Sequence, residues 1–85
     1  MWYVYVLENR DMNYMYVGST GNLKLRLAQH NSGESKATKP YIPLQLISYV
    51  AVNSEPKARR LEKYFKSGSG KAILKKRILQ TEALA

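Results

Sequence analysis

Two tyrosine-rich segments near the start of the chain constrain its fold more than any other feature. Residues 2–7 read WYVYVL, residues 14–18 read YMYVG, and a short polar stretch separates them. Because β-branched and aromatic residues favour strands, two such runs in close succession predict a β-hairpin. Alternation along the first strand places Tyr3, Tyr5 and Leu7 on one of its faces.

The pairing of the two strands depends on where the turn lies. If the hairpin is centred between Arg10 and Asp11, Tyr5 lies opposite Tyr16 in the second strand. This register would bring two phenol groups together, because directly opposite side chains in an antiparallel pair are close neighbours.

A helix is expected after the hairpin. Asn22 is a good N-cap residue, and the helix should run to about His30. Leu23, Leu27 and His30 are spaced i, i+4 and i+7, so the histidine extends the apolar stripe of this helix. Arg26, four residues before the histidine, borders the same stripe.

The second half of the chain predicts one strand and two helices. Residues 44–52 are more hydrophobic than the first two strands, so we expect this third strand in the middle of the sheet. Ser54 caps a helix, the SGSG sequence at 67–70 breaks it, and a final helix follows at about 71–79. The residues expected on the buried faces of these helices are Ala58, Leu61, Phe65, Ile73, Leu74 and Ile78.

The resulting order, β-β-α-β-α-α, predicts an α+β fold in which helices flank a small three-stranded, mainly antiparallel sheet. The length of 85 residues suits one domain, which we place at residues 1–79, with a frayed tail at 80–85. The chain has no cysteine, which excludes thiolate metal sites and fits a cytoplasmic location. The apolar run at 2–7 is too short to span a membrane.

The chain is strongly basic, with 14 Lys and Arg against six Asp and Glu and a net charge of +8. Between residues 57 and 77 the only acidic residue is Glu62. Such a surface favours a polyanion, because each neutralised phosphate releases counterions. The alternative is a solvated surface that only aids solubility. The basic residues that we expect to bind nucleic acid are Lys24, Lys36, Lys39, Arg59, Lys66 and Lys71.

Glu62 occupies an informative position. It lies four residues after Ala58 and three before Phe65, on or beside the expected buried face of its helix. A carboxylate beside a phosphate-binding surface suits Mg²⁺, which takes one or two carboxylates and completes its shell with water and phosphate. The alternative is a helix ion pair with Lys66, worth only about 0.3–0.5 kcal/mol. Position alone leaves both interpretations open.

Four other residues have side chains suited to phosphodiester chemistry, although none is decisive by itself. Arg26 could clamp a phosphate through two parallel hydrogen bonds, or be an ordinary surface cation. His30 could be a buried histidine near a helix end, and Tyr5 and Tyr16 could be a packing pair. A free phenol has a pKa of about 10, so a catalytic tyrosine would need help from a cation or a metal.

Four spaced motifs, taken together, resemble the GIY-YIG nuclease superfamily. They are YVY at 3–5, YVG at 16–18, LKLRLAQHNSG at 23–33 and ARRLEKYFKSGSGK at 58–71. The resemblance covers roughly residues 2–78. It looks closest to the small single-domain branch, which is similar to the nuclease module of the excision-repair incision protein UvrC.

The resemblance implies a role for each candidate residue. Tyr5 and Tyr16 match the tyrosines of the two named motifs, and such a tyrosine is proposed in this family to activate the attacking water. Arg26 matches the arginine that contacts the scissile phosphate, and His30 falls where the family has histidine or tyrosine near the reacting groups. Glu62 matches the single metal-binding glutamate, so the implied cofactor is Mg²⁺ or Mn²⁺.

Some positions of the second motif and its surroundings carry their own implications. Gly18 would let the backbone turn close to the substrate. Tyr3 replaces the glycine of the first motif. Ser19 and Thr20 stand where the repair nuclease carries a lysine, so any activating role of that lysine is absent or moved. No asparagine follows Glu62, although some members use one late in the domain.

The favoured function is a metal-dependent endonuclease that hydrolyses DNA, with DNA repair or recombination as its setting. We expect structure-directed or weakly specific cleavage, because a lone module buries only about 600–1,000 Å² on DNA. One alternative is a binding module with this fold and little or no activity. Another is an RNA-directed nuclease or RNA-binding domain. Neither a membrane nor a small-molecule cofactor is implied, and a protein partner stays open.

Overall fold

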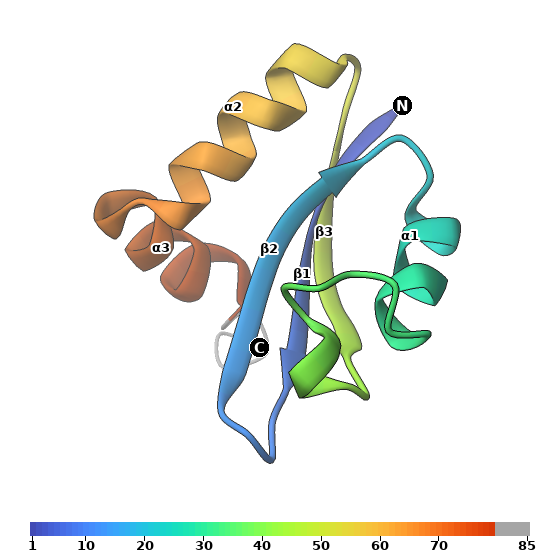
Figure 1. Cartoon of the computed structure of the whole chain (residues 1–85). Helices are drawn as coiled ribbons and strands as arrows, with labels where there is room; N and C mark the ends of the chain where they lie inside the picture. The colour runs from blue at the N-terminus through green and yellow to red at the C-terminus, as the bar shows by residue number, and fades with distance from the viewer. Residues whose placement is uncertain (80–85) are drawn as a thin grey trace.

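The computed structural model describes the backbone of residues 1–79 and the side chains of residues 1–76. The elements, in chain order, are β1 (Trp2–Asn9), β2 (Tyr14–Thr20), α1 (Leu23–Asn31), a 3₁₀ turn η1 (Lys39–Tyr41), β3 (Gln45–Val52), α2 (Glu55–Lys66), α3 (Gly68–Ile73) and a π-helical segment η2 (Leu74–Leu79). The expected α+β fold and its element order are confirmed (Figure 1). The tail expected at 80–85 lies outside the described residues. None of the helices described is long and apolar enough to cross a membrane.

The sheet is antiparallel, with the strand order β2-β1-β3. The expectation that β3 is central was wrong, because β1 occupies that place. Four consecutive residues of β1, from Val4 to Leu7, are buried, whereas every other residue of β3 near its end is exposed. A strand covered on both faces must bury both sets of alternating side chains.

Helices cover the two faces of the sheet (Figure 1). On one face Val4 and Val6 pack in a cluster with Ala58 and Phe65 of α2. On the other face Tyr5 and Leu7 form a second cluster, and the partly buried residues packed against it include Leu23 and Leu27 of α1. The alternating side chains of the first strand therefore contribute to two hydrophobic cores, one beneath each helical layer.

The hairpin register differs from the expectation that Tyr5 lies opposite Tyr16. Tyr5 pairs with Gly18, and Tyr16 pairs with Leu7. The pairing has moved by two residues, and an even shift keeps the same side chains on the same face. The two tyrosines are therefore diagonal neighbours, with ring centroids 6.4 Å apart.

The turn explains the shift in register. It occupies residues 10–13, and the N–H of Asn13 donates to the carbonyl of Arg10 at 3.1 Å. Asn13 has a φ of 51°, a left-handed conformation that asparagine adopts more readily than most residues. The N–H of Met12 donates to the Asn9 side chain at 3.1 Å. These bonds centre the hairpin one residue later than expected.

The helix starts follow the expected capping residues. The side chain of Asn22 accepts from the N–H of Leu25, and that of Ser54 accepts from the N–H of Lys57. The SGSG sequence separates two helices as expected, but the break is confined to Ser67, which caps α3, so that both glycines lie in the first turn of α3. Consequently the helix expected at 71–79 begins at Gly68.

The buried faces of the last helices agree with the expectation in part. Ala58 and Phe65 are buried, and Leu61 packs partly buried against them. Leu74 is also buried, whereas Ile73 is 40% exposed, so its expected burial was wrong. Ile78 lies outside the residues whose side chains are described.

The corner between α2 and α3 predicts a large difference between two glycines. A Cβ at Gly70 would overlap the Tyr64 carbonyl, at a distance that no real Cβ atom shows. A Cβ at Gly68 meets nothing within 4 Å. Gly70→Ala should therefore lower the free energy of unfolding by at least about 1–3 kcal/mol, the usual cost of overpacking. Gly68→Ala should leave it unchanged or slightly higher. Urea titrations of both variants measure this difference, and equal stabilities would contradict the packing of this corner.

Candidate active site

A buried chain of hydrogen bonds lies at the centre of the site. The Tyr5 hydroxyl is 2.8 Å from Nε2 of His30, and Nδ1 of His30 is 2.7 Å from the Thr38 hydroxyl. All three side chains are almost fully excluded from solvent. The Tyr16 ring also contacts the imidazole, with centroids 5.2 Å apart. The sequence-predicted residues Tyr5, Tyr16 and His30 are thus brought together.

Thr38 is the member of this chain that sequence reasoning missed. It lies in the segment between α1 and η1, where its N–H donates to the Ser35 carbonyl at 3.3 Å. Asn31, the residue after His30, does not touch the imidazole, but its side chain donates to the Leu44 carbonyl and accepts from the Leu44 N–H, at 2.9 and 2.6 Å. This clamp ties the end of α1 to the residue before β3. A loop threonine has no periodic pattern, so nothing in the sequence singles it out.

Burial sets the protonation state of the central pair. Burial, and secondarily the positive charge of Arg26, lowers the pKa of His30 below its ordinary 6.5. Burial also raises the pKa of the Tyr5 phenol above 10.0, although the Arg26 guanidinium opposes this shift. At neutral pH the site therefore holds a neutral imidazole hydrogen-bonded to a neutral phenol. A neutral imidazole has one donor and one acceptor nitrogen, which suits its two hydroxyl partners.

The lowered pKa of His30 predicts that stability falls in mild acid. Below pH 6.5 the unfolded chain binds a proton at this residue, while the folded chain does so only at a lower pH. The free energy of unfolding should therefore decrease from about pH 7 downward, by at most about 1.4 kcal/mol per pH unit for one proton. Denaturant titrations between pH 7.5 and 5.5 measure the slope. The slope should flatten in His30→Gln, and the same slope in both proteins would contradict a buried neutral imidazole.

Gly18 provides the space that the Tyr5 phenol occupies. A Cβ at Gly18 would lie 2.5 Å from the Tyr5 hydroxyl and 2.6 Å from Cζ of the same ring. We expected this glycine to let the backbone turn close to the substrate, but it lies inside β2, directly opposite Tyr5. Its physical role in the free protein is to let the ring lie flat against the strand and reach His30.

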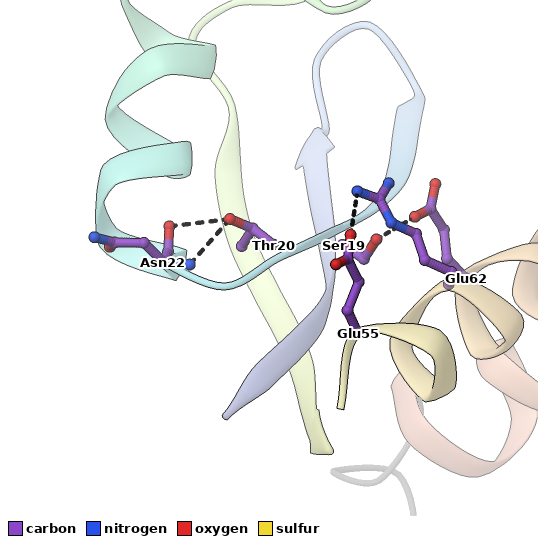
Figure 2. Close-up of polar contacts among 6 residues, drawn as sticks. Ser19, Thr20, Asn22, Glu55 and Glu62 are labelled. Atoms are coloured by element: carbon purple, nitrogen blue, oxygen red, sulfur yellow. Dashed lines mark hydrogen bonds and ion pairs between the residues drawn. The ribbon is translucent and has the colours of Figure 1, made fainter. Parts of the chain in front are cut away.

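Glu62 lies beside the end of β2, on the face covered by α2 (Figure 2). The Ser19 hydroxyl donates to its Oε1 at 2.5 Å, and Nζ of Lys66 donates to its Oε2 at 2.8 Å. The neighbouring Thr20 points the other way, toward Asn22 at the start of α1 (Figure 2). The end of β2 therefore links the two helices that carry the candidate site.

The Glu62 carboxyl is ionised at neutral pH. Burial would raise its pKa, but the hydrogen bonds from Lys66 and Ser19, with the charges of Lys66 and Arg59, outweigh burial and lower it. The Glu62 side chain is 19% exposed, so solvent and ligands can reach it. Both interpretations of this residue thus remain compatible with its contacts, since it forms the helix ion pair and presents a reachable carboxylate.

The donor set fits a hard divalent cation. Among the described residues there is no group of three or more His, Cys, Asp and Glu side chains that could hold a metal. An ion bound at Glu62 would thus have one protein carboxylate, with the Ser19 hydroxyl beside it. Mg²⁺ accepts such a site, because it keeps several waters and takes further oxygens from substrate phosphate.

The basic residues expected to bind nucleic acid are distributed over several elements. Lys24, Lys36 and Lys39 are exposed on α1, in the loop that follows it and in η1. Arg59 pairs with Glu55 at 3.1 Å and lies over the Trp2 ring.

Two of these basic residues lie near the site instead. Lys66 contacts Glu62 and also lies over the Tyr16 ring, with Nζ 5.4 Å from the centroid. Lys71 lines a cavity with Lys66. Arg26 borders the tyrosine–histidine centre, and its guanidinium donates to Gln29 at 3.1 Å.

These features define a class of protein, a small α+β domain whose tyrosine–histidine centre and Glu62 carboxylate flank one edge strand. The model of the GIY-YIG catalytic domain matches residues 1–77, and the chain belongs to this family. The family is one of nucleases, so the resemblance read from the motifs is confirmed.

Curated relatives support the same assignment. A UPF0213 protein of Streptococcus agalactiae serotype V is 40% identical over 73 residues, which cover 85% of this chain and 82% of the relative. UPF0213 proteins of Streptococcus pneumoniae and Streptococcus pyogenes serotype M5 are 43% and 42% identical over 65 residues. Those alignments cover 75% of this chain, and 65% and 70% of the relatives. No solved structure matches the chain.

Proposed function

We propose that this chain is a metal-dependent endonuclease that hydrolyses DNA phosphodiester bonds. The observation that carries the proposal is the pairing of a buried Tyr5–His30 hydrogen bond with an ionised carboxylate across one strand. Lys66 links the two halves, because its Nζ contacts Glu62 and lies over the Tyr16 ring. Proton transfer and a bound cation are two contributions that lower the barrier to phosphodiester hydrolysis.

The protein groups act as a proton relay in this proposal. With Nδ1–H donating to Thr38, the unprotonated Nε2 of His30 accepts the Tyr5 O–H. As water attacks phosphorus, its proton passes to the Tyr5 oxygen and the phenol proton passes to Nε2. The bond from phosphorus to the leaving oxygen breaks, and this oxygen takes a proton from solvent, to which His30 later returns its own. The relay needs no free phenolate, which agrees with the raised pKa of Tyr5.

Two further groups complete the proposed site. Arg26 contacts the non-bridging phosphate oxygens, where its guanidinium offsets the developing negative charge. Glu62 would hold Mg²⁺ or Mn²⁺, which when bound supplies Lewis-acid stabilisation to a phosphate oxygen. Ser19 keeps the carboxylate in position through its hydrogen bond to Oε1.

The expected substrate is recognised by its structure rather than by a long sequence. A single small domain has little surface for reading bases, so cleavage should be structure-directed or weakly specific. A setting in DNA repair or recombination and a cytoplasmic location stay predictions. The alternatives are a binding module with weak or no activity, and a protein directed to RNA.

Cleavage assays test the proposal. Labelled duplex, single-stranded, flap and branched DNA, with matched RNA, are incubated with the protein and Mg²⁺, Mn²⁺ or a chelator. Metal-dependent cleavage of DNA that follows the protein through purification is the expected result. Binding without cleavage under all conditions would favour the binding module, and a preference for RNA at the same salt concentration would favour the RNA alternative.

A further inference from the structure

A cavity of about 520 Å³ lies between β2 and the corner formed by α2 and α3. Tyr16 and Lys66 line it, and both also contact the candidate active site. The Tyr16 ring lies 5.2 Å from the His30 ring, and Nζ of Lys66 lies 2.8 Å from Glu62. A group bound in this cavity, which we call the β2 cavity, would therefore lie beside two residues, Tyr16 and Lys66, that contact the candidate active site.

The lining of the β2 cavity is basic. Arg10 and Glu8 lie at one end, where they form an ion pair of 3.3 Å. Lys66 is engaged by Glu62, whereas Lys71 and Lys75 form no ion pair within the described part of the chain. Both of these lysines are exposed. Their ammonium groups are thus available to an anion that enters the cavity.

Aromatic rings lie beside these cations. Tyr14 and Tyr16 line the β2 cavity, and Tyr14 is fixed by stacking on Tyr41, with ring centroids 3.6 Å apart and planes 1° from parallel. Burial, followed by the neighbouring Tyr41, raises the pKa of Tyr14, so the phenol stays neutral and does not repel an anion. Cations combined with aromatic faces bind single-stranded nucleic acids, because every base has a face that can stack.

The size of the cavity limits what can enter. Its volume lies in the range of about 300–1,000 Å³ that is typical of sites for small ligands, so one nucleotide can be accommodated. A base pair cannot enter a cavity of this size while it remains stacked in a duplex, but an unpaired base can. The cavity therefore distinguishes paired from unpaired nucleotides by shape.

We infer that the β2 cavity binds one unpaired nucleotide of the substrate strand, with its base against Tyr14 and Tyr16 and its phosphate against Lys71 and Lys75. The inference rests on the proposed function in taking nucleic acid as the substrate. It adds that the strand is unpaired next to the position of cleavage, as in a flap, a frayed end or a single strand. DNA and RNA share this chemistry.

Binding without metal tests the inference separately from cleavage. Fluorescence anisotropy in a chelator measures the affinity for a labelled thymidine decamer and for a blunt duplex of equal length. The double variant Lys71→Ala/Lys75→Ala should bind the decamer about tenfold more weakly and the duplex less than threefold more weakly. The slope of the salt dependence for the decamer should fall by about 0.7, because both lysines contact one phosphate and each phosphate neutralised on a single strand contributes about 0.7.

The double variant Lys57→Ala/Lys63→Ala is the matched control. It loses the same charge from α2, but neither residue lines the β2 cavity. It should weaken both ligands by a similar factor and keep the ratio of their affinities. If the two double variants change that ratio equally, Lys71 and Lys75 belong only to a general basic surface and the inference is wrong.

Two further ligands sharpen the result. An abasic decamer keeps the phosphates and should bind at least about fivefold more weakly, since stacking contributes roughly 1–3 kcal/mol per base. Equal binding of the thymidine and abasic decamers would show that the β2 cavity does not bind a base. A uridine decamer identifies DNA or RNA as the tighter single strand. If cleavage is absent but the Lys71→Ala/Lys75→Ala variant loses decamer binding, the proposed nuclease activity is wrong and the nucleotide site is supported. If the protein cleaves DNA but this variant binds the decamer normally, only the nucleotide site is wrong.

Discussion

Glu62→Gln is expected to abolish metal-dependent cleavage while DNA binding survives. The amide keeps an oxygen for the Ser19 hydroxyl but removes the negative charge that would hold the cation. Metal catalysis supplies several kcal/mol of transition-state stabilisation, so the cleavage rate should fall by about 10³-fold or more. DNA affinity should stay equal or rise by roughly twofold, because a negative charge leaves a basic surface. Cleavage rates and anisotropy on the same substrate give both quantities.

Glu55→Gln provides the matched control for this prediction. Both glutamates lie on α2, and each pairs with a basic residue four positions later, at 3.1 Å for Arg59 and 2.8 Å for Lys66. Losing either pair should cost only about 0.3–0.5 kcal/mol of stability. Only the Glu62 variant should lose cleavage and the binding of Mn²⁺ measured by electron paramagnetic resonance. If both variants cleave normally, Glu62 is simply an ion-pair residue and the metal site is wrong.

Local sequence signals predicted the helices and strands, but not which strands lie side by side in the sheet or in which register. The strands of the hairpin and the caps Asn22 and Ser54 depend on residues a few positions apart, so the sequence was sufficient to place them. The central position of β1 depends instead on its packing against helices formed by distant parts of the chain. The hydrophobic run of β3 therefore favoured the wrong strand. The register likewise depended on the left-handed Asn13, whose conformation the sequence does not reveal.

The candidate site divides in the same way. The motifs predicted Tyr5, Tyr16 and His30 as a group, and the structure brings their rings together. The partners that orient them come from unrelated positions. Thr38 lies in a loop, and the bond from Ser19 to Glu62 joins residues 43 positions apart. Sequence patterns report periodic faces and caps, whereas such contacts arise only after the two helical layers have packed on the sheet.

Gly18→Ala should disable the site even though the new side chain is a single methyl group. The added Cβ would lie 2.5 Å from the Tyr5 hydroxyl and 3.0 Å from the Tyr16 ring, so both rings must shift. The Tyr5–His30 hydrogen bond would lengthen or break as a result. Overpacking should lower the free energy of unfolding by about 1–3 kcal/mol. Misplacement of a reacting group by roughly 1 Å can cost about 10²-fold in rate, which is the loss of cleavage expected here.

The mechanism of this loss can be observed without an activity assay. The chain has one histidine, so a single imidazole signal in nitrogen-15 NMR spectra reports the environment of His30. That signal should shift in Gly18→Ala, because Nε2 loses its hydroxyl partner. Gly21→Ala is the matched control, since the atoms nearest to its Cβ belong to the Trp2 ring, at 3.3 Å, and it should leave the signal and the cleavage rate nearly unchanged. A folded Gly18→Ala protein with an unshifted imidazole signal and full activity would show that the strand can open to admit the methyl group, and that the close fit of the phenol is not what makes the site work.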